Sequence, residues 1–205
     1  MNVNISYSYE DSFKKAKQKL DELQPIWQAF GEETDRATAI LSACVLDDLL
    51  EDLIRASFIK DTRVKSMFRD DHILQSFFAK INIAYFSGLI PEVFYHDLKL
   101  ICEIRNRFAH STVADLKFTH DTIFQRIDKF SQIPKHLAEL YPPRLKFELM
   151  VAHIAGLLLA WEAFLLEFQP PNLVKLLKLE QMAFQDLIMK PEQIRDNALK
   201  GNRTI

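Results

Sequence analysis

The residues best suited to chemistry lie in one short segment of the chain, residues 101–110. Arg105 and His110 are five residues apart, and the amide side chain of Asn106 directly follows the arginine. A histidine can act as a general base, and an arginine can stabilise the negative charge that develops during phosphoryl transfer. The segment is therefore compatible with metal-independent RNA cleavage, with His110 as the base and Arg105 or Arg107 as the cation. It is also compatible with a structural role, in which Arg105 is a buried clamp and His110 only ends a helix.

The helix that carries this segment is predicted to begin at Pro91 and to end near His110. Apolar residues recur along it at helical spacing: Phe94, Leu98, Ile101, Ile104 and Phe108. At about 100° per residue, Arg105 falls within the stripe that these residues form. The sequence thus predicts that the Arg105 side chain faces the core of the protein.

An arginine that faces a core needs a partner, because its guanidinium keeps its charge and an unpaired buried charge is costly. A long helix predicted earlier in the chain carries an inner apolar stripe of Ala37, Leu41, Cys44 and Val45. Asp48 falls on the continuation of this stripe, with Asp47 beside it. We expect Arg105 to form an ion pair with Asp47 or Asp48, and thereby to clamp one helix to another. Glu33 and Asp35 are the alternative partners.

Asn106 and His110 are four residues apart, so they share one face of their helix. The Asn106 amide is expected to hydrogen-bond the His110 imidazole and to fix its tautomer, which is the support that a general-base histidine needs. This face points away from the core. His110 is therefore expected to meet solvent or a partner subunit.

The composition favours a soluble bundle of helices. The chain has 205 residues, 48% of them hydrophobic, with four glycines against 16 phenylalanines. Sheet proteins need turn glycines, so this ratio predicts an all-α fold, a single bundle of about seven or eight helices. The net charge of -2 indicates neither nucleic acid nor an anionic membrane as a partner. Residues 1–13 resemble no signal peptide, so we expect a cytoplasmic protein, with Cys44 and Cys102 as buried free thiols.

Helices are expected at residues 9–29, 32–58, 73–87, 91–110, 121–130, 144–168 and 173–189. A charged connector at 59–71 and a polar break at 111–120 separate some of them, and glycine or proline separates the others. We predict a bundle domain over residues 1–169 and a C-terminal helical arm over residues 170–205. The apolar run at 149–166 contains His153 and Glu162. It is therefore predicted to be the most buried helix of the bundle and not a membrane span.

Neither a metal ion nor another cofactor is expected. Four acidic residues follow one another closely on the second predicted helix: Asp47, Asp48, Glu51 and Asp52. Such a run is typical of a solvated helix face. No histidine stands beside it at ligand spacing, so the pattern does not indicate a metal site.

Several blocks of the sequence, taken as a set, resemble the mannitol repressor (MltR) family over about residues 30–165. The blocks are residues 33–37, 39–41, 46–47, 78–81, 84–90, 97–98, 101 and 104–110, with Glu33, Asp35, Arg36, Lys80, Tyr85 and Gly88 as motif residues. The resemblance implies an all-α fold and a role as a transcriptional repressor or regulator of mannitol uptake and related genes. That family has no recognisable DNA-binding motif, and this sequence shows no helix-turn-helix with a basic second helix. Where the family has a glycine-rich connector, residues 70–75 here read Asp-Asp-His-Ile-Leu-Gln.

Residues 105–110 are also similar to the signature of HEPN domains, in which an arginine, a polar residue and a histidine form an RNase site, often completed across a dimer. Arg105, Asn106 and His110 occupy those positions. The function expected first is a regulator that acts as a homodimer through a protein partner, with no membrane partner and with direct DNA binding absent or weak. The alternatives are an endoribonuclease that acts on RNA, and a non-catalytic partner-binding module, because many HEPN-like domains are not catalytic.

Overall fold

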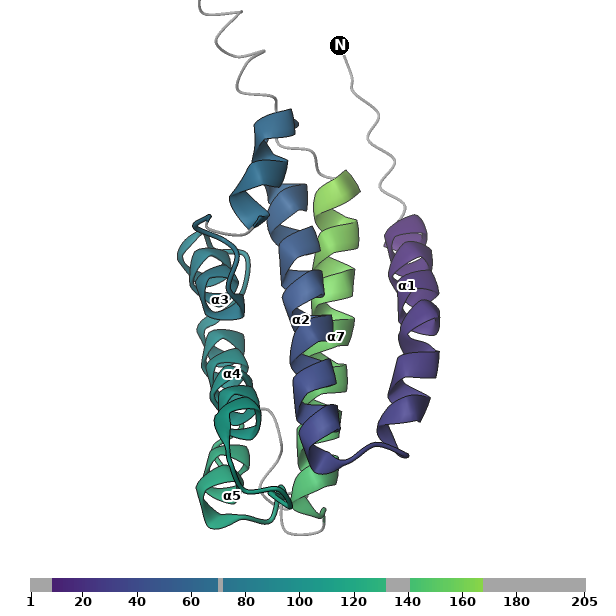
Figure 1. Cartoon of the computed structure of the whole chain (residues 1–205). Helices are drawn as coiled ribbons and strands as arrows, with labels where there is room; N and C mark the ends of the chain where they lie inside the picture. Colours follow the sequence, from purple (N-terminus) through teal and green to yellow (C-terminus); the bar gives the residue numbers. More distant parts are fainter. Residues whose placement is uncertain (1–8, 70–71, 132–140, 168–205) are drawn as a thin grey trace, which may run out of the picture. The chain divides into compact units, whose positions relative to one another are not determined.

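The computed structural model describes residues 9–69, 72–131 and 141–167, and these form an all-α bundle with no strand among them (Figure 1). The elements are α1 (Tyr9–Phe30), α2 (Asp35–Ser57), the short 3-10 helix η1 (Thr62–Phe68), α3 (Phe77–Phe86), α4 (Glu92–His110), α5 (Asp121–Ile127) and α7 (Pro143–Glu167). The predicted all-α class is confirmed. The predicted arm at residues 170–205, with its helix at 173–189, lies outside the described residues.

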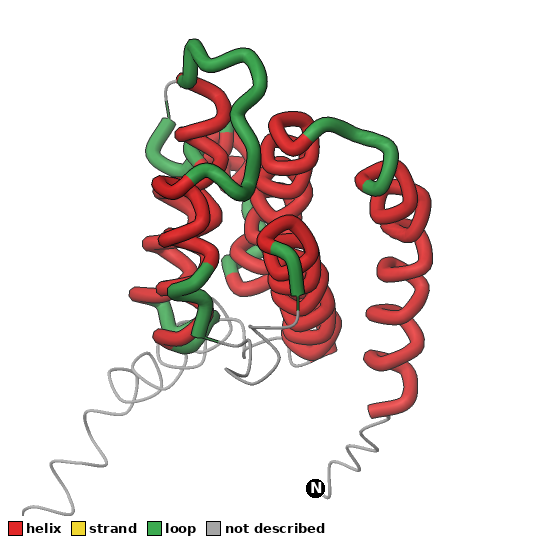
Figure 2. The backbone as a smooth tube through the Cα atoms, turned by 90° about the horizontal axis from the view of Figure 1, so that it is seen from below, coloured by secondary structure: helices red, strands yellow, loops and turns green. Residues whose placement is uncertain are grey.

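Helices α2 and α7 form the centre of the bundle. Helix α2 contacts α7, α3 and α4, while α1 packs on α7 and α5 bridges α4 and α7. In Figure 2, α1 is the helix that follows the N-terminal label, and it lies on the opposite side of the α2–α7 pair from the other helices. The core side chains come from all of these layers, and the largest fully buried ones include Phe30, Leu50, Ile101, Phe108, Phe118 and Phe147.

The helix boundaries follow local capping chemistry. Helix α2 begins after Thr34, whose side chain accepts a hydrogen bond from the backbone N–H of Ala37. Helix α3 begins in the same way after Ser76. Gly88 follows the end of α3 with a φ of 74°, a left-handed conformation that glycine adopts without strain. Helix α4 then ends at His110, as the sequence predicts.

Helix α2 is rotated relative to the sequence-based expectation. The predicted inner stripe included Leu41, Cys44 and Asp48, but Leu41 is 41% exposed and the other two residues are also exposed. The buried face instead begins with small residues: Thr38, Ala39, Ser42 and Ala43. Small side chains allow the neighbouring helix to approach closely, so this face lies in the core although its apolar signal is weak. The expectation of two buried thiols is therefore wrong for Cys44 and correct for Cys102.

Helix α7 is long and apolar enough to cross a membrane, but it is also built into the bundle. Of its most apolar window, 44% is buried within the structure. Its polar residues are paired there: the Nζ of Lys146 lies 3.6 Å from Asp128, and Glu162 accepts from Lys19 of α1 over 2.5 Å. These contacts agree with the prediction of a bundle helix. His153, expected in the core, lies exposed with its ring 6.0 Å from that of Phe94.

Candidate functional site

The predicted ion pair between Arg105 and Asp47 or Asp48 is not formed among the described residues. Arg105 is half-buried, and its Nη1 donates to the Oδ1 of the adjacent Asn106 over 2.8 Å. Asp48 is exposed, because α2 turns that residue outward. The Asp47 carboxylate instead pairs with Lys80 of α3, whose Nζ lies 3.0 Å from its Oδ1. The helix clamp at this place is therefore a lysine and not an arginine.

Lys80 is buried, with 3% of its surface exposed, and it bridges Asp47 and Glu51, the latter at 2.8 Å. Burial alone would lower the pKa of the Lys80 ammonium, but hydrogen bonds to Glu51 and Asp47 outweigh it and the pKa is raised. Burial likewise raises the pKa of Asp47, whereas hydrogen bonds from Lys80 and Arg55 overcome burial at Glu51 and lower its pKa. The cluster holds α3 against α2. The sequence carries one signal for this cluster: Lys80 lies three residues after Phe77, so the two share one face of their helix.

A true arginine clamp exists at Arg144, which the sequence analysis did not single out. Its Nη1 donates to Asp35 over 2.9 Å, and its Nη2 donates to the hydroxyl of Thr38 over 3.0 Å and to the carbonyl of Phe30. Its Nε donates to Glu148 on α7 itself. The predicted alternative partner Asp35 therefore does hold an arginine, but one that comes from α7.

The segment after α4 is ordered by the start of α2. Predicted as a polar break, residues 111–120 contain two buried side chains, Leu116 and Phe118. The Nη2 of Arg36 donates to the carbonyls of Ser111 and Val113, over 3.3 and 2.6 Å, and the backbone N–H of Phe118 donates to Asp35 over 2.8 Å. The two motif residues Asp35 and Arg36 thus fix this loop in place.

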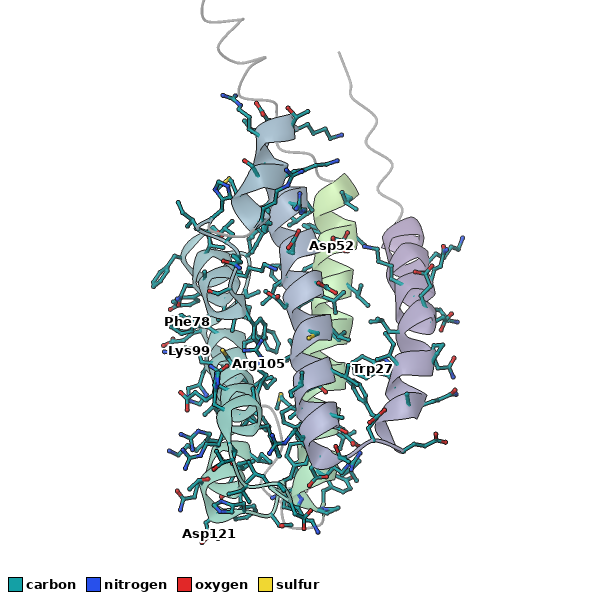
Figure 3. The ribbon with its side chains drawn as sticks, in the orientation of Figure 1. Trp27, Asp52, Phe78, Lys99, Arg105 and Asp121 are labelled. Carbon is teal, nitrogen blue, oxygen red and sulfur yellow. The ribbon has the colours of Figure 1, made fainter. Side chains whose placement is uncertain are left out.

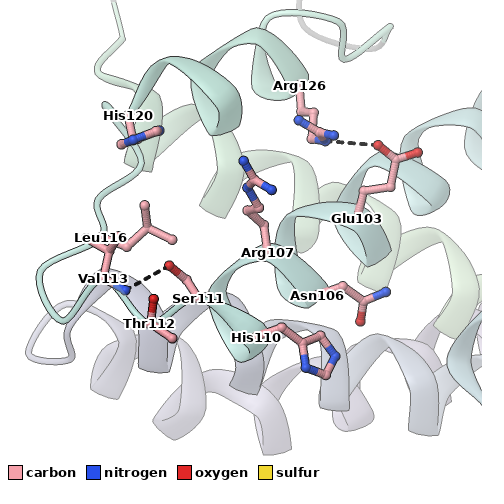
Figure 4. A pocket seen from close by; sticks show the side chains of 10 residues that line it. All are labelled: Glu103, Asn106, Arg107, His110, Ser111, Thr112, Val113, Leu116, His120 and Arg126. Atoms are coloured by element: carbon pink, nitrogen blue, oxygen red, sulfur yellow. Dashed lines mark hydrogen bonds and ion pairs between the residues drawn. The ribbon is translucent and has the colours of Figure 1, made fainter.

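The loop forms one wall of a pocket of about 540 Å3, which we call the α4–α5 pocket (Figure 4). Its other walls are the last turns of α4 and the helix α5. Four basic or imidazole side chains line it: Arg107 and His110 from α4, His120 from the end of the loop, and Arg126 from α5. Glu103 and Asn106 of α4, the loop residues 111–113 and Leu116 complete the lining.

Only part of the predicted catalytic set lines this pocket, namely Asn106 and His110, together with Arg107. Figure 4 shows Arg107 and Arg126 in the space between α4 and α5, while His110 lies on the other side of α4 and points away from them. Arg105 does not line the pocket. Asn106 accepts from Arg105 and donates to the Sγ of Cys102 over 3.8 Å, so it does not hold the His110 imidazole as expected. Burial raises the pKa of the Cys102 thiol, which keeps it protonated.

The prediction that Asn106 and His110 face outward is correct, since both are exposed. Glu33, another predicted candidate, is exposed at the start of α2 and forms no ion pair with a described residue. Among the described residues, no group of acidic, histidine and cysteine side chains has the arrangement of a metal site.

A second surface feature lies on α3 and α4, where aromatic side chains gather outside the core. Tyr85 stacks on Tyr95 with ring centroids 4.3 Å apart, and Phe86 is 75% exposed beside them. The Nζ of Lys99 lies 5.1 Å from the ring of Tyr95 and 5.9 Å from that of Phe78. Figure 3 shows Phe78 and Lys99 next to one another on this side of the bundle. We call these residues, Phe78, Tyr85, Phe86, Tyr95 and Lys99, the aromatic patch.

The described fold defines the class of the protein as an all-α bundle with a basic pocket beside one helix end. No protein-family model matches the chain, and no curated protein gives a match. A solved structure that is similar to this chain is the X-ray structure of the MtlR-HPr complex from Escherichia coli. The sequence identity is 18% and the TM-score is 0.45, over 75% of this chain and 99% of that chain.

Proposed function

We propose that this protein is a non-catalytic regulator of the mannitol-repressor type, which acts in the cytoplasm through contact with a protein partner. The sequence blocks that resemble that family support this proposal. In the structure, their motif residues build the scaffold: Asp35 and Arg36 hold a loop, Lys80 joins two helices, and Gly88 allows a turn. In the described fold, these residues have structural roles.

The observation that carries the proposal is the aromatic patch. Phe86 is 75% exposed and lies beside the stacked pair Tyr85 and Tyr95. Phe78 is 48% exposed and lies near Lys99. Aromatic residues that gather on a surface mark protein–protein contacts, because they bury a large apolar area with little loss of side-chain entropy. Lys99 lies at the edge of the patch, so it favours a partner that presents an apolar group beside a carboxylate.

The test uses a strain that lacks the gene and is complemented with variants of the full chain. Wild-type protein should restore the normal transcript profile, whereas Phe86→Glu should not, because it places a charge at the centre of the patch. Leu41→Glu is the matched control, since Leu41 is exposed on α2 outside the patch. Circular dichroism checks that both variants are folded. Full restoration by Phe86→Glu would refute the proposed docking surface.

Two solution measurements extend this test. A gel-shift assay at physiological salt should show no sequence-specific DNA binding by the isolated protein. Sedimentation equilibrium tests the expected homodimer. If Phe86→Glu converted a dimer into monomers, the patch would be occupied by a second copy of the chain and not by a different protein.

A metal-independent endoribonuclease is the second candidate, and one observation favours it. The exposed imidazole of His110 borders the α4–α5 pocket together with Arg107. Incubation of wild-type and His110→Ala protein with mixed RNA in EDTA tests this function. Because His110 and Arg107 point in different directions, we expect no cleavage that depends on His110. Cleavage that disappears in the variant would establish the nuclease and overturn the regulator proposal.

A further inference from the structure

We propose that the α4–α5 pocket binds the phosphate group of a small phosphorylated molecule. This site is separate from the aromatic patch, so the proposal does not depend on the regulator function. It rests on the charge, the hydrogen-bond donors and the size of the pocket, together with the way in which α2 fixes the pocket wall.

Two guanidinium groups line the pocket. Arg107 on α4 and Arg126 on α5 both reach into the space between these two helices (Figure 4). Arg126 is partly neutralised, because its Nε donates to Glu103 over 2.9 Å. Arg107 forms no hydrogen bond or ion pair with another described residue. Like charges that share a pocket repel unless an anion lies between them, so the arrangement suits a ligand with negative charge.

Two further groups of the pocket lining can donate hydrogen bonds, while the Glu103 carboxylate in the same lining is paired with Arg126. The Oγ of Ser111 accepts from the backbone N–H of Val113 over 3.1 Å, which leaves its hydroxyl hydrogen free to donate. The Nδ1 of His120 lies 3.4 Å from the backbone N–H of Thr122 and 3.1 Å from its hydroxyl. In the tautomer in which Nδ1 accepts from the backbone, the ring carries its hydrogen at Nε2. A phosphate has three terminal oxygens and accepts such bonds from several directions, whereas a carboxylate offers two oxygens in one plane. Donors on separate elements therefore favour phosphate.

The size of the pocket indicates an organic body attached to that phosphate. A volume of about 540 Å3 exceeds what a free phosphate ion fills, and it lies in the usual range for small-molecule sites. Leu116 and Val113 give the loop side of the pocket an apolar surface on which carbon atoms can pack. The structure thus points to a phosphate monoester of the size of a sugar phosphate or a nucleotide.

The pocket wall is fixed before a ligand arrives. Arg36 holds the carbonyls of Ser111 and Val113, and Asp35 holds the backbone of Phe118. Phe118 itself is 1% exposed, with its ring 5.0 Å from Phe108. A wall that is already ordered loses little conformational entropy on binding, which raises affinity.

Isothermal titration calorimetry of the full chain tests the proposal with defined probes: inorganic phosphate, ribose 5-phosphate and AMP. Ribose and adenosine are the matched molecules without phosphate. We expect ribose 5-phosphate or AMP to bind at least about tenfold more tightly than its dephosphorylated counterpart. If none of the three phosphate probes binds, or if ribose and adenosine bind equally well, the proposal is wrong.

Variants then locate the binding. Arg107→Gln and Arg126→Gln should each weaken the binding of the phosphate ester by about tenfold or more. Arg63→Gln is the matched control, because Arg63 is 87% exposed on η1, outside the pocket, and should bind as wild type does. Arg107→Gln removes no contact within the described protein, so it should leave the urea midpoint unchanged. Unchanged affinity in Arg107→Gln, or an equal loss in Arg63→Gln, would overturn the site.

Discussion

The Nη1 of Arg144 lies 2.9 Å from the Oδ1 of Asp35, and this ion pair joins the first turn of α7 to the first turn of α2. The same guanidinium reaches the carbonyl of Phe30 at the end of α1. Three helix ends therefore meet at one side chain. The hydrogen bonds are charge-assisted and the pair is partly shielded from water, so they contribute more than surface contacts do.

Replacing Arg144 by alanine should lower the free energy of unfolding by about 2–3 kcal/mol, because it removes these bonds and leaves Asp35 without its cation. Arg105→Ala is the contrasting change. Arg105 bonds only to the neighbouring Asn106 among the described residues, and its loss should cost less than about 0.5 kcal/mol. Urea denaturation of both variants measures the difference. An equal or larger loss for Arg105→Ala would contradict the assignment of the clamp.

The Lys80 cluster should make stability depend on alkaline pH. Removing the ammonium in Lys80→Met leaves Asp47 and Glu51 facing each other, and we expect a loss of about 2 kcal/mol at pH 7. The loss is moderate because both carboxylates retain some contact with water.

The pH dependence of this difference follows from the raised pKa of Lys80 in the folded protein. A raised lysine pKa stabilises the fold fully below the unfolded value of about 10.5 and loses that effect as pH rises through the folded value. The difference in unfolding free energy between wild type and Lys80→Met should therefore become smaller above about pH 10.5. Urea midpoints between pH 7 and 11.5 test this, with Lys65→Met on exposed Lys65 as the control. A difference that stays constant over this pH range would show that the charge of the Lys80 ammonium does not stabilise the fold.

Phe118 should prove to be a core residue, although it lies in a loop. Its ring lies 4.8 Å from that of Phe147 and 5.0 Å from that of Phe108. Phe118→Ala should therefore cost about 3–4 kcal/mol of unfolding free energy. Phe124→Ala, at a residue that is 38% exposed, should cost less than about 1 kcal/mol. Comparable losses in the two variants would mean that the loop does not pack as described.

Arg36 should control the order of the loop more than the stability of the whole fold. In Arg36→Ala, which lacks the two carbonyl contacts, the amides of residues 111–116 should exchange their hydrogens about fivefold faster, as expected from the loss of roughly one kcal/mol of local stability. Hydrogen exchange followed by mass spectrometry measures this. Exchange in α2 and α7 should stay as in wild type. A uniform increase across the chain would indicate a global effect instead.

Much of the helical framework could be predicted from the sequence, because apolar spacing and capping residues are local signals. The end of α4 at His110 and the outward direction of Asn106 and His110 were correct for this reason. The partner of Arg105 was not predictable in the same way. Helical periodicity predicts the direction of a side chain only to within a wide stripe of the helix surface. A long arginine at the edge of that stripe can therefore carry its charge out of the core.

The contacts between segments that are distant in the sequence could not be predicted from local sequence patterns either. The buried face of α2 starts with Thr38 and Ser42, whose hydroxyl groups weaken the apolar signal that a core stripe normally gives. Arg144 and Asp35 are 109 residues apart, and no local pattern connects them. The α4–α5 pocket depends on such pairings, so it appears only when the helices are packed.

The contacts that hold the loop at residues 111–120 come from distant parts of the chain, so they form at different times during synthesis. One carboxylate oxygen of Asp35 accepts from the backbone N–H of Phe118, 83 residues later in the chain, and the other accepts from Arg144. A chain that has emerged from the ribosome only as far as α5 therefore has the pocket-lining residues but not the clamp that locks their support. We expect the nascent protein to become competent for ligand only after the start of α7 has left the exit tunnel, which ties ligand binding to completion of the bundle.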